Sequence, residues 1–301
     1  MDLTKAVLAV LIVANVAFVV GWLLAVRRFG LRGRPQLADV AIGAFTTFLD
    51  TLGIGSFAPT TALLKFRGKV ADELIPGTLN VGLNAAGFLE TLLLIGLVKV
   101  QPVLLASMVA SAAAGAWLGA GVVSRMPRRA IQLFMGAALL IAAFFFAMTN
   151  LGALPAGGAA MGLAGWQFPF AVVVSFVLGA LMCIGIGNYA PLMILLSLLG
   201  MAPIAAYPIM MASDGLLQPA ASLGFFRSGR FSHVASLGLT AGSFVGVSLA
   251  FSILKFVLEK PDGVKLIRWL VTAVVVYSAV AMLRSARRER AAARAAAVVS
   301  H

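Results

Sequence analysis

Apolar runs of about 20 residues recur along the whole chain, and each is long enough to cross the hydrocarbon core of a bilayer as a helix. They cover roughly 6–26, 38–64, 74–98, 102–123, 130–149, 168–199, 201–224, 233–257 and 265–283. Charged residues make up only 11% of the 301 residues, whereas a soluble domain carries about 25%. The runs therefore predict an all-α polytopic membrane protein.

The formal net charge of +13 does not indicate a nucleic-acid partner, because the basic residues cluster in short loops between the apolar runs. The single cysteine, Cys183, excludes an intramolecular disulfide bond. We expect no cofactor, no metal site and no catalytic residues, so the chain is not expected to be an enzyme. The lipid bilayer is the partner that this composition predicts.

The first apolar run is expected to be a retained helix rather than a cleaved signal peptide. A signal peptide carries positive charge before its apolar core, whereas Arg27, Arg28, Arg32 and Arg34 follow this run. Basic loops stay on the cytoplasmic side of a membrane. We therefore expect a multi-pass protein of the cell inner (plasma) membrane, with the N-terminus outside and the C-terminus in the cytoplasm.

Two of the apolar runs contain the same helix-breaking loop, LGIGSFAPT at residues 52–60 and IGIGNYAPL at residues 184–192. The glycines permit a turn, and the proline that follows cannot continue a helical hydrogen-bond ladder. An offset of 132 positions matches residues of one loop and its flanks with the other: Gly53, Gly55, Ala58, Pro59, Gly68 and Pro76 match Gly185, Gly187, Ala190, Pro191, Gly200 and Pro208. The sequence therefore predicts an internal repeat.

The distribution of lysine and arginine indicates how these two runs are placed. Nine straight crossings put 12 of the 23 basic residues inside and 11 outside, which is no bias. If each run with the repeated loop enters and leaves on the same side, 17 are inside and 6 outside. The charges therefore favour two re-entrant hairpins inserted from opposite faces, each followed by three crossings. Because three is odd, the second repeat is inverted relative to the first.

The expected organisation follows directly from this topology. It has an N-terminal transmembrane helix and basic cytoplasmic loop at 1–37, a first repeat at 38–150, a periplasmic linker at 151–167, a second repeat at 168–284, and a basic cytoplasmic tail at 285–301.

Inverted repeats with broken helices near the midplane are typical of secondary transporters. The second arm of each hairpin begins with unpaired amides and the positive end of a helix dipole, an environment that favours a negative charge. We expect the following residues to bind such an anion: Gly53, Gly55, Ser56, Phe57, Ala58, Gly185, Gly187, Asn188, Tyr189 and Ala190. Ser56 and Asn188 each add a side-chain donor.

The duplicated loops LGIGSFAP and IGIGNYAP, together with the two-repeat plan and the chain length, resemble the TauE/SafE sulfite exporter family over residues of about 38 to 284. The loop is bulkier than the run of three glycines that many members carry. The resemblance implies export of sulfite or a related sulfur oxyanion, including organosulfonates, from the cytoplasm. The residues themselves indicate only a transporter of small anions.

Three acidic residues lie within apolar runs, where ionisable groups are costly and usually functional. Asp50, Asp214 and Glu90 are candidates for proton coupling, with helix bracing as the alternative, and Glu90 is expected nearer the outer face. Two polar pairs at helical spacing are equivalent in the repeats and can face the pocket or bond neighbouring helices: Asn80 and Asn84, Asp214 and Gln218.

Several other functions stay open at this point. Two hairpins meeting at the midplane suit a passive anion channel, and a carrier for small carboxylates is a further alternative. A membrane scaffold without transport is a third class. An intramembrane hydrolase using Ser56 is remote, because a base in reach is required and the only histidines are His233 and His301. A homodimer is a further open alternative, because faces rich in glycine and alanine suit close packing between helices.

Overall fold

The computed structural model describes residues 3–52, 54–94, 99–153, 158–185, 187–258, 269, 272, 273, 275–277, 279–288, 290 and 291. Within these residues every regular element is a helix, and the only β-type pairing is an isolated bridge between Ala160 and Met201. The expected all-α class is therefore confirmed for the described part of the chain.

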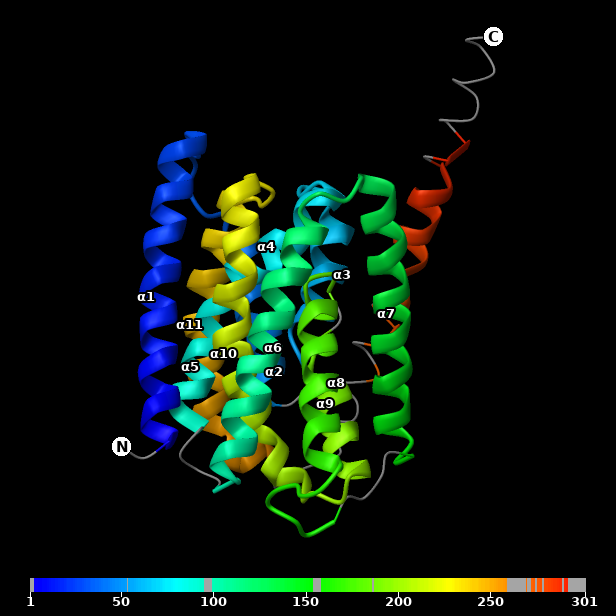
Figure 1. The fold of residues 1–301 in the computed structure, drawn as a ribbon. Helices are drawn as coiled ribbons and strands as arrows, with labels where there is room; N and C mark the ends of the chain where they lie inside the picture. Colours follow the sequence, from blue (N-terminus) through cyan, green and yellow to red (C-terminus); the bar gives the residue numbers. More distant parts are fainter. Residues whose placement is uncertain are drawn as a thin grey trace.

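The helices form an upright bundle whose members run roughly parallel to one long axis (Figure 1). They are α1 (Leu3–Phe29), α2 (Leu37–Thr51), α3 (Phe57–Arg67), the 3₁₀ turn η1 (Asp72–Leu74), α4 (Ile75–Gly82), α5 (Asn84–Leu94), α6 (Pro102–Val123), α7 (Arg128–Asn150), α8 (Gln167–Met182), α9 (Tyr189–Leu198), α10 (Pro203–Ser228) and α11 (His233–Leu258). The described residues from 269 to 291 are also helical, and Figure 1 shows them beside α7.

Four helices of the described part are long and apolar enough to cross a membrane by length and composition: Ala6–Phe29, Pro102–Val123, Arg128–Asn150 and His233–Ser252. Helix α1 illustrates why the surroundings must be apolar. Val13 is 68% exposed and Val16 is 59% exposed, so this helix turns large hydrophobic side chains outward along the bundle. An apolar outer surface of this extent indicates contact with membrane.

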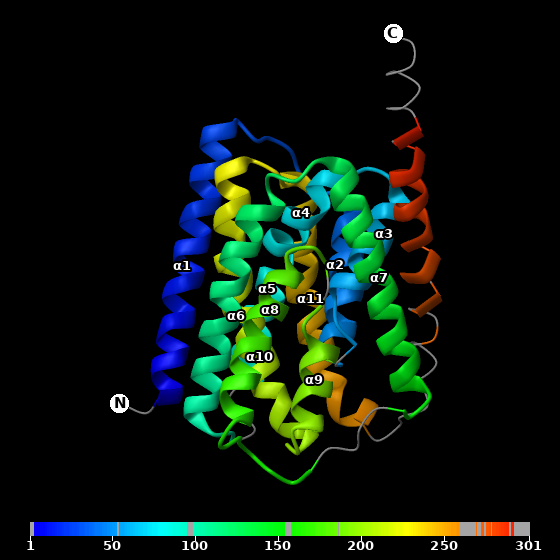
Figure 2. The ribbon, with the colours of Figure 1, turned by 45° about the vertical axis from the view of Figure 1, so that its right-hand side comes forward.

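Two pairs of helices reverse direction part of the way along the bundle (Figures 1 and 2). Helix α2 starts at the upper end and α3 returns to that end, whereas α8 starts at the lower end and α9 returns to it. Gly55 and Gly185 have backbone φ values of 91° and 97°, a conformation that residues other than glycine rarely adopt. Glycine at these two positions is what lets the chain break its helix and turn.

The first arm of each pair packs closely on a helix far away in the sequence. Helix α2 packs along α11, where a Cβ at Gly242 would lie 2.2 Å from the carbonyl oxygen of Val40. Helix α8 packs along α6, where a Cβ at Gly115 would lie 1.9 Å from the carbonyl oxygen of Phe176. Only glycine allows backbones this close, as in other membrane helix pairs.

One break in the bundle was not predicted. The apolar run at 74–98 was expected to be one crossing, whereas the structure divides its described part into η1, α4 and α5, with an interruption at Leu83. Gly82 and Asn84 flank this position, and both are residue types that favour helix ends. The interruption could have been expected from these two residues.

Ion pairs gather where α3 ends. Lys65 Nζ lies 2.7 Å from Asp72 Oδ1, and Arg67 pairs with Asp39 at the start of α2. The Asp72 carboxylate also accepts a hydrogen bond of 2.7 Å from Gln132 of α7. These contacts join the end of the α2–α3 pair to η1 and α7, and therefore fix it to the rest of the bundle.

Candidate functional site

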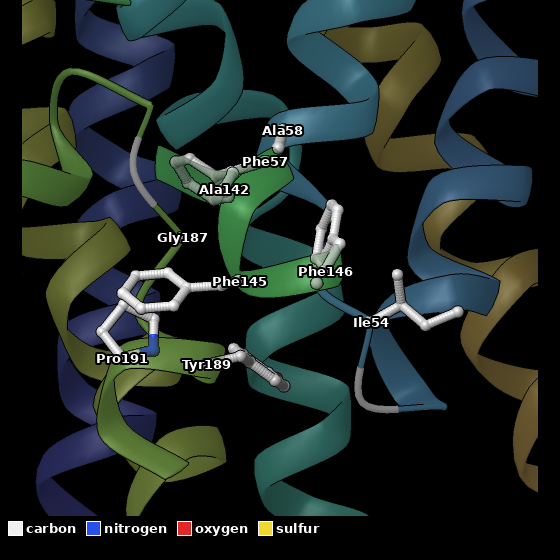
Figure 3. A pocket seen from close by; sticks show the side chains of 10 residues that line it. Ile54, Phe57, Ala58, Ala142, Phe145, Phe146, Gly187, Tyr189 and Pro191 are labelled. Atoms are coloured by element: carbon white, nitrogen blue, oxygen red, sulfur yellow. The ribbon is translucent and has the colours of Figure 1, made fainter. Parts of the chain in front are cut away.

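The turn between α2 and α3 and the turn between α8 and α9 meet at one small cavity (Figure 3). Its lining is mostly apolar and consists of Ile54, Gly55, Phe57, Ala58, Ala142, Phe145, Phe146, Gly187, Tyr189 and Pro191. Its volume is about 30 Å³, room for roughly two water molecules. The structure thus brings together Gly55, Phe57 and Ala58 of the first loop with Gly187 and Tyr189 of the second.

Main-chain amides are the polar groups that the two turns offer. Within α3 the amide of Thr60 bonds the carbonyl of Ser56 at 2.9 Å, and within α9 the amide of Leu192 bonds the carbonyl of Asn188 at 2.9 Å. The amides that precede these have no partner inside their own helix. Helix α3 begins at Phe57 and α9 begins at Tyr189, so both positive helix ends lie at the cavity lining.

Ser56 does not present a free hydroxyl to the cavity. Its Oγ donates a hydrogen bond of 2.5 Å to Asp50 Oδ2, and its backbone amide lies near the same carboxylate. Asp50 is 2% exposed and lies one turn before the loop. The carboxylate of this hairpin therefore occupies the donors that were expected to receive an external anion.

The second turn shows a related arrangement. Asn188 is 1% exposed and lies beside the carboxylate of Asp214 on α10. That carboxylate acts on the side-chain amide of Asn188, although the two make no hydrogen bond of ordinary geometry within the described part of the chain. A guest at the second turn would therefore compete with the Asp214 carboxylate for the side chain of Asn188.

The other polar residues expected at the site lie away from the cavity lining. Asn80 Nδ2 donates to the Pro76 carbonyl of its own helix at 2.9 Å, and Asn84 Nδ2 donates to Asn15 Oδ1 at 2.9 Å. Gln218 is buried, 1% exposed, but does not line the cavity. Gly53 lies outside the described residues, as does the side chain of Ala190, and Gly185 is buried but does not line the cavity.

Glu90 connects the two turns. Thr51 Oγ1 donates to Glu90 Oε1 at 2.7 Å, and the Tyr189 hydroxyl donates to Glu90 Oε2 at 2.9 Å. Because Thr51 ends α2 and Tyr189 begins α9, this carboxyl lies between the two loops. The carboxyl of Glu90 is also close enough to Asp50 and Asp214 to interact with both electrostatically.

The three buried carboxyls have no cation among the groups that act on them in the described part of the chain. Ionising all three at once would leave several like charges uncompensated in an apolar interior, which is strongly unfavourable. The same region holds no cluster of three or more His, Cys, Asp or Glu side chains arranged to bind a metal, as far as the described residues extend. Protons are the simplest way to neutralise these groups.

Sequence reasoning did not find the contribution of α7. Phe145 and Phe146 line the cavity together with Ala142, and Figure 3 shows their rings beside the two turns. These residues lie in an ordinary apolar run with no motif, so no local signal separates them from lipid-facing side chains.

Replacing Tyr189 with phenylalanine is expected to destabilise the protein by about 1–3 kcal/mol, because Glu90 Oε2 loses its donor in a buried site. Thermal unfolding of the purified protein measures this loss. The matched control is Tyr277→Phe, because Tyr277 is 59% exposed and its ring lies edge-on to that of Phe66. Equal unfolding temperatures for the two variants would show that the Tyr189–Glu90 bond does not stabilise the fold.

Comparison with models of known protein families found no match, and comparison with curated proteins and with solved structures found none either.

Proposed function

We propose that the protein is a secondary transporter that exports a small sulfur oxyanion, sulfite or a related organosulfonate, across the inner membrane by alternating access, coupled to protons. The observation that carries this proposal is the cavity where two oppositely directed helix turns place the first amides of α3 and α9, which have no partner within their own helices. Backbone amides at helix N-termini bind anions without a basic side chain. The absence of a fixed positive charge among the lining residues suits a substrate that must also leave.

The pattern of helix contacts supports an inverted repeat of re-entrant hairpins. If α2–α3 corresponds to α8–α9, then α4–α5 corresponds to α10, and α6 to α11. When each helix is replaced by its counterpart in the other repeat, the packing of α2 on α11 corresponds to the packing of α8 on α6, and both contacts are extensive. Likewise the packing of α6 on α10 becomes that of α11 on α4 and α5, which is also present. Two inverted copies of one unit are expected to produce such corresponding contacts between helices.

The orientation of the loops supports placement of one end of the bundle in the cytoplasm. The loops that follow α1, α3, α6 and α10 all carry arginine or lysine, and Figure 1 shows them at the upper end, towards which the C-terminal helical residues also run. Basic residues are retained on the cytoplasmic side. The linker after α7, which carries no charge between 151 and 167, begins and ends at the opposite end.

Proton coupling follows from competition for the same donors. While Asp50 is ionised, it holds the amide and hydroxyl of Ser56. When a proton neutralises it, those donors become available to an anion, and electrostatic repulsion between carboxylate and anion disappears. Binding of the anion and binding of a proton are then mutually favourable. The anion and the proton therefore move together.

The size of the cavity favours a small anion. With room for about two water molecules, it must widen even for an ion of three or four non-hydrogen atoms, and an extended organosulfonate would need a much larger change. The resemblance to sulfite exporters agrees with this size. The substrate assignment rests on that resemblance and on the cavity.

A thermal-shift screen of the purified protein with sulfite, sulfate, thiosulfate, sulfonates and carboxylates tests the proposal. A ligand that binds only the native state at 100 times its Kd adds about 2.7 kcal/mol of stability. We expect stabilisation by sulfite and loss of this effect in Gly187→Val, because a Cβ at Gly187 meets only the Phe57 Cβ at 4.0 Å and a side chain there fills the cavity. Gly121→Val, on the outer face of α6, is the control and should retain the effect.

Two results would redirect the assignment. Stabilisation by carboxylates but not by sulfur oxyanions would identify a carboxylate carrier. Flux into inside-out vesicles that neither saturates nor responds to a pH gradient would identify a passive channel, since alternating access requires a saturable step.

A further inference from the structure

A second pocket lies between the ends of α6 and α10, away from the cavity at the turns. Arg125 and Arg227 both line it, and its volume is about 350 Å³, within the range of roughly 300–1,000 Å³ typical of ligand sites. Arg125 follows the end of α6 and Arg227 is in the last turn of α10, so the two guanidinium groups lie at the same end of the bundle. Both side chains are exposed.

The two arginines have no acidic partner in the described part of the chain. Asp39, Asp72 and Glu73 pair with Lys65, Arg67 and Arg128 near the end of α3. The remaining acidic residues of the described part, Asp50, Glu90 and Asp214, form the buried group at the turns. No acidic residue lines the pocket itself. Two like charges that share a pocket repel each other until an anion joins them.

The pocket continues from this charged end onto apolar surface. Trp117 and Leu118 also line it, and they are 49% and 51% exposed. Trp117 precedes Arg125 by eight residues of sequence, about 12 Å along a helix axis. Gly121 lies between them on α6, and a Cβ there would meet open space. A tryptophan at this depth below a basic helix end is typical of the membrane interface.

We propose that this pocket binds an anionic phospholipid of the leaflet that faces the basic end of the bundle. The phosphate bonds the guanidinium groups of Arg125 and Arg227, which suit a phosphate through their planar donor fork. The acyl chain lies along Gly121, Leu118 and Trp117. The combination of two unpaired cations with an adjoining apolar groove matches an amphipathic lipid, whereas free phosphate uses only the charged half.

Native mass spectrometry of the protein with phosphatidylglycerol or phosphatidylcholine tests this site. We expect the wild-type chain to retain one phosphatidylglycerol in preference to phosphatidylcholine. In Arg125→Gln/Arg227→Gln the affinity for phosphatidylglycerol should fall about 25-fold, roughly fivefold for each arginine near an anionic headgroup. Arg129→Gln is the matched control, because Arg129 is exposed beside the same loop but does not line the pocket.

A second variant separates a lipid from a free anion. Gly121→Leu fills the groove while both arginines remain, so it should lose the bound lipid and keep its thermal stability. Equal retention of phosphatidylglycerol by the wild type and the double arginine variant would overturn the proposal. Two further results together would also overturn it and assign a free-phosphate site. These are displacement of the lipid by millimolar inorganic phosphate and unchanged retention of phosphatidylglycerol by Gly121→Leu.

Discussion

Replacing Asp50 with asparagine is expected to abolish the response of transport to a proton gradient. Asparagine keeps the size of the side chain and can still accept a hydrogen bond from Ser56, but it cannot gain or lose a proton. One coupled proton lets a pH difference of one unit drive about tenfold accumulation of the anion. Asp50→Asn should therefore reduce accumulation about tenfold under that gradient, while exchange of anion across the membrane continues.

The measurement is uptake of labelled sulfite into inside-out vesicles at several pH values. In the wild type the apparent affinity for the anion should increase as pH falls, because protonated Asp50 frees the donors of Ser56. In Asp50→Asn this dependence should flatten. Asp39→Asn is the control, since Asp39 is on the same helix but pairs with Arg67 in the first turn of α2, away from the loop. A variant at Asp50 that still follows the proton gradient would contradict the coupling mechanism.

Replacing Gly115 with valine is expected to lower the free energy of unfolding by about 3 kcal/mol or more. A Cβ at this position would lie 1.9 Å from the carbonyl oxygen of Phe176, so α6 and α8 must move apart. Hydrogen bonds between the same helices, such as Ser175 Oγ to the Met108 carbonyl at 2.9 Å, would lengthen with that movement. The unfolding temperature should fall by on the order of 10 °C.

The matched control for this loss is Gly121→Val on the same helix. Its Cβ meets open space, so only intrinsic helix propensity changes, by about 0.5 kcal/mol. Gly242→Val is expected to behave like Gly115→Val, because its Cβ would lie 2.2 Å from the Val40 carbonyl at the crossing of α2 and α11. Similar unfolding temperatures for Gly115→Val and Gly121→Val would show that the α6–α8 contact does not require glycine.

The class of the fold could be predicted from local information. The apolar runs predict helices because a chain in lipid must satisfy its backbone hydrogen bonds internally. The loops at 52–60 and 184–192 predict the breaks because glycine and proline act on the backbone where they stand. The break at Leu83 was missed, since its flanking Gly82 and Asn84 give a weaker signal than a glycine-proline loop.

The candidate site could be predicted only in part. Gly55, Phe57, Gly187 and Tyr189 were expected together on the basis of the repeat, and they line one cavity. The partner of the Ser56 hydroxyl could not be predicted, because Asp50 reaches it only through the particular turn of this hairpin.

The sequence by itself determined the helical class, the positions of the two glycine-proline breaks and the uneven distribution of basic residues, because each depends on residues adjacent in the chain. Only the tertiary structure decided that Glu90 lies between Thr51 and Tyr189, that Phe145 and Phe146 complete the cavity, and that Arg125 and Arg227 share a pocket. These are contacts between segments tens to more than a hundred residues apart. The packing of whole helices sets such contacts, and no local pattern records it.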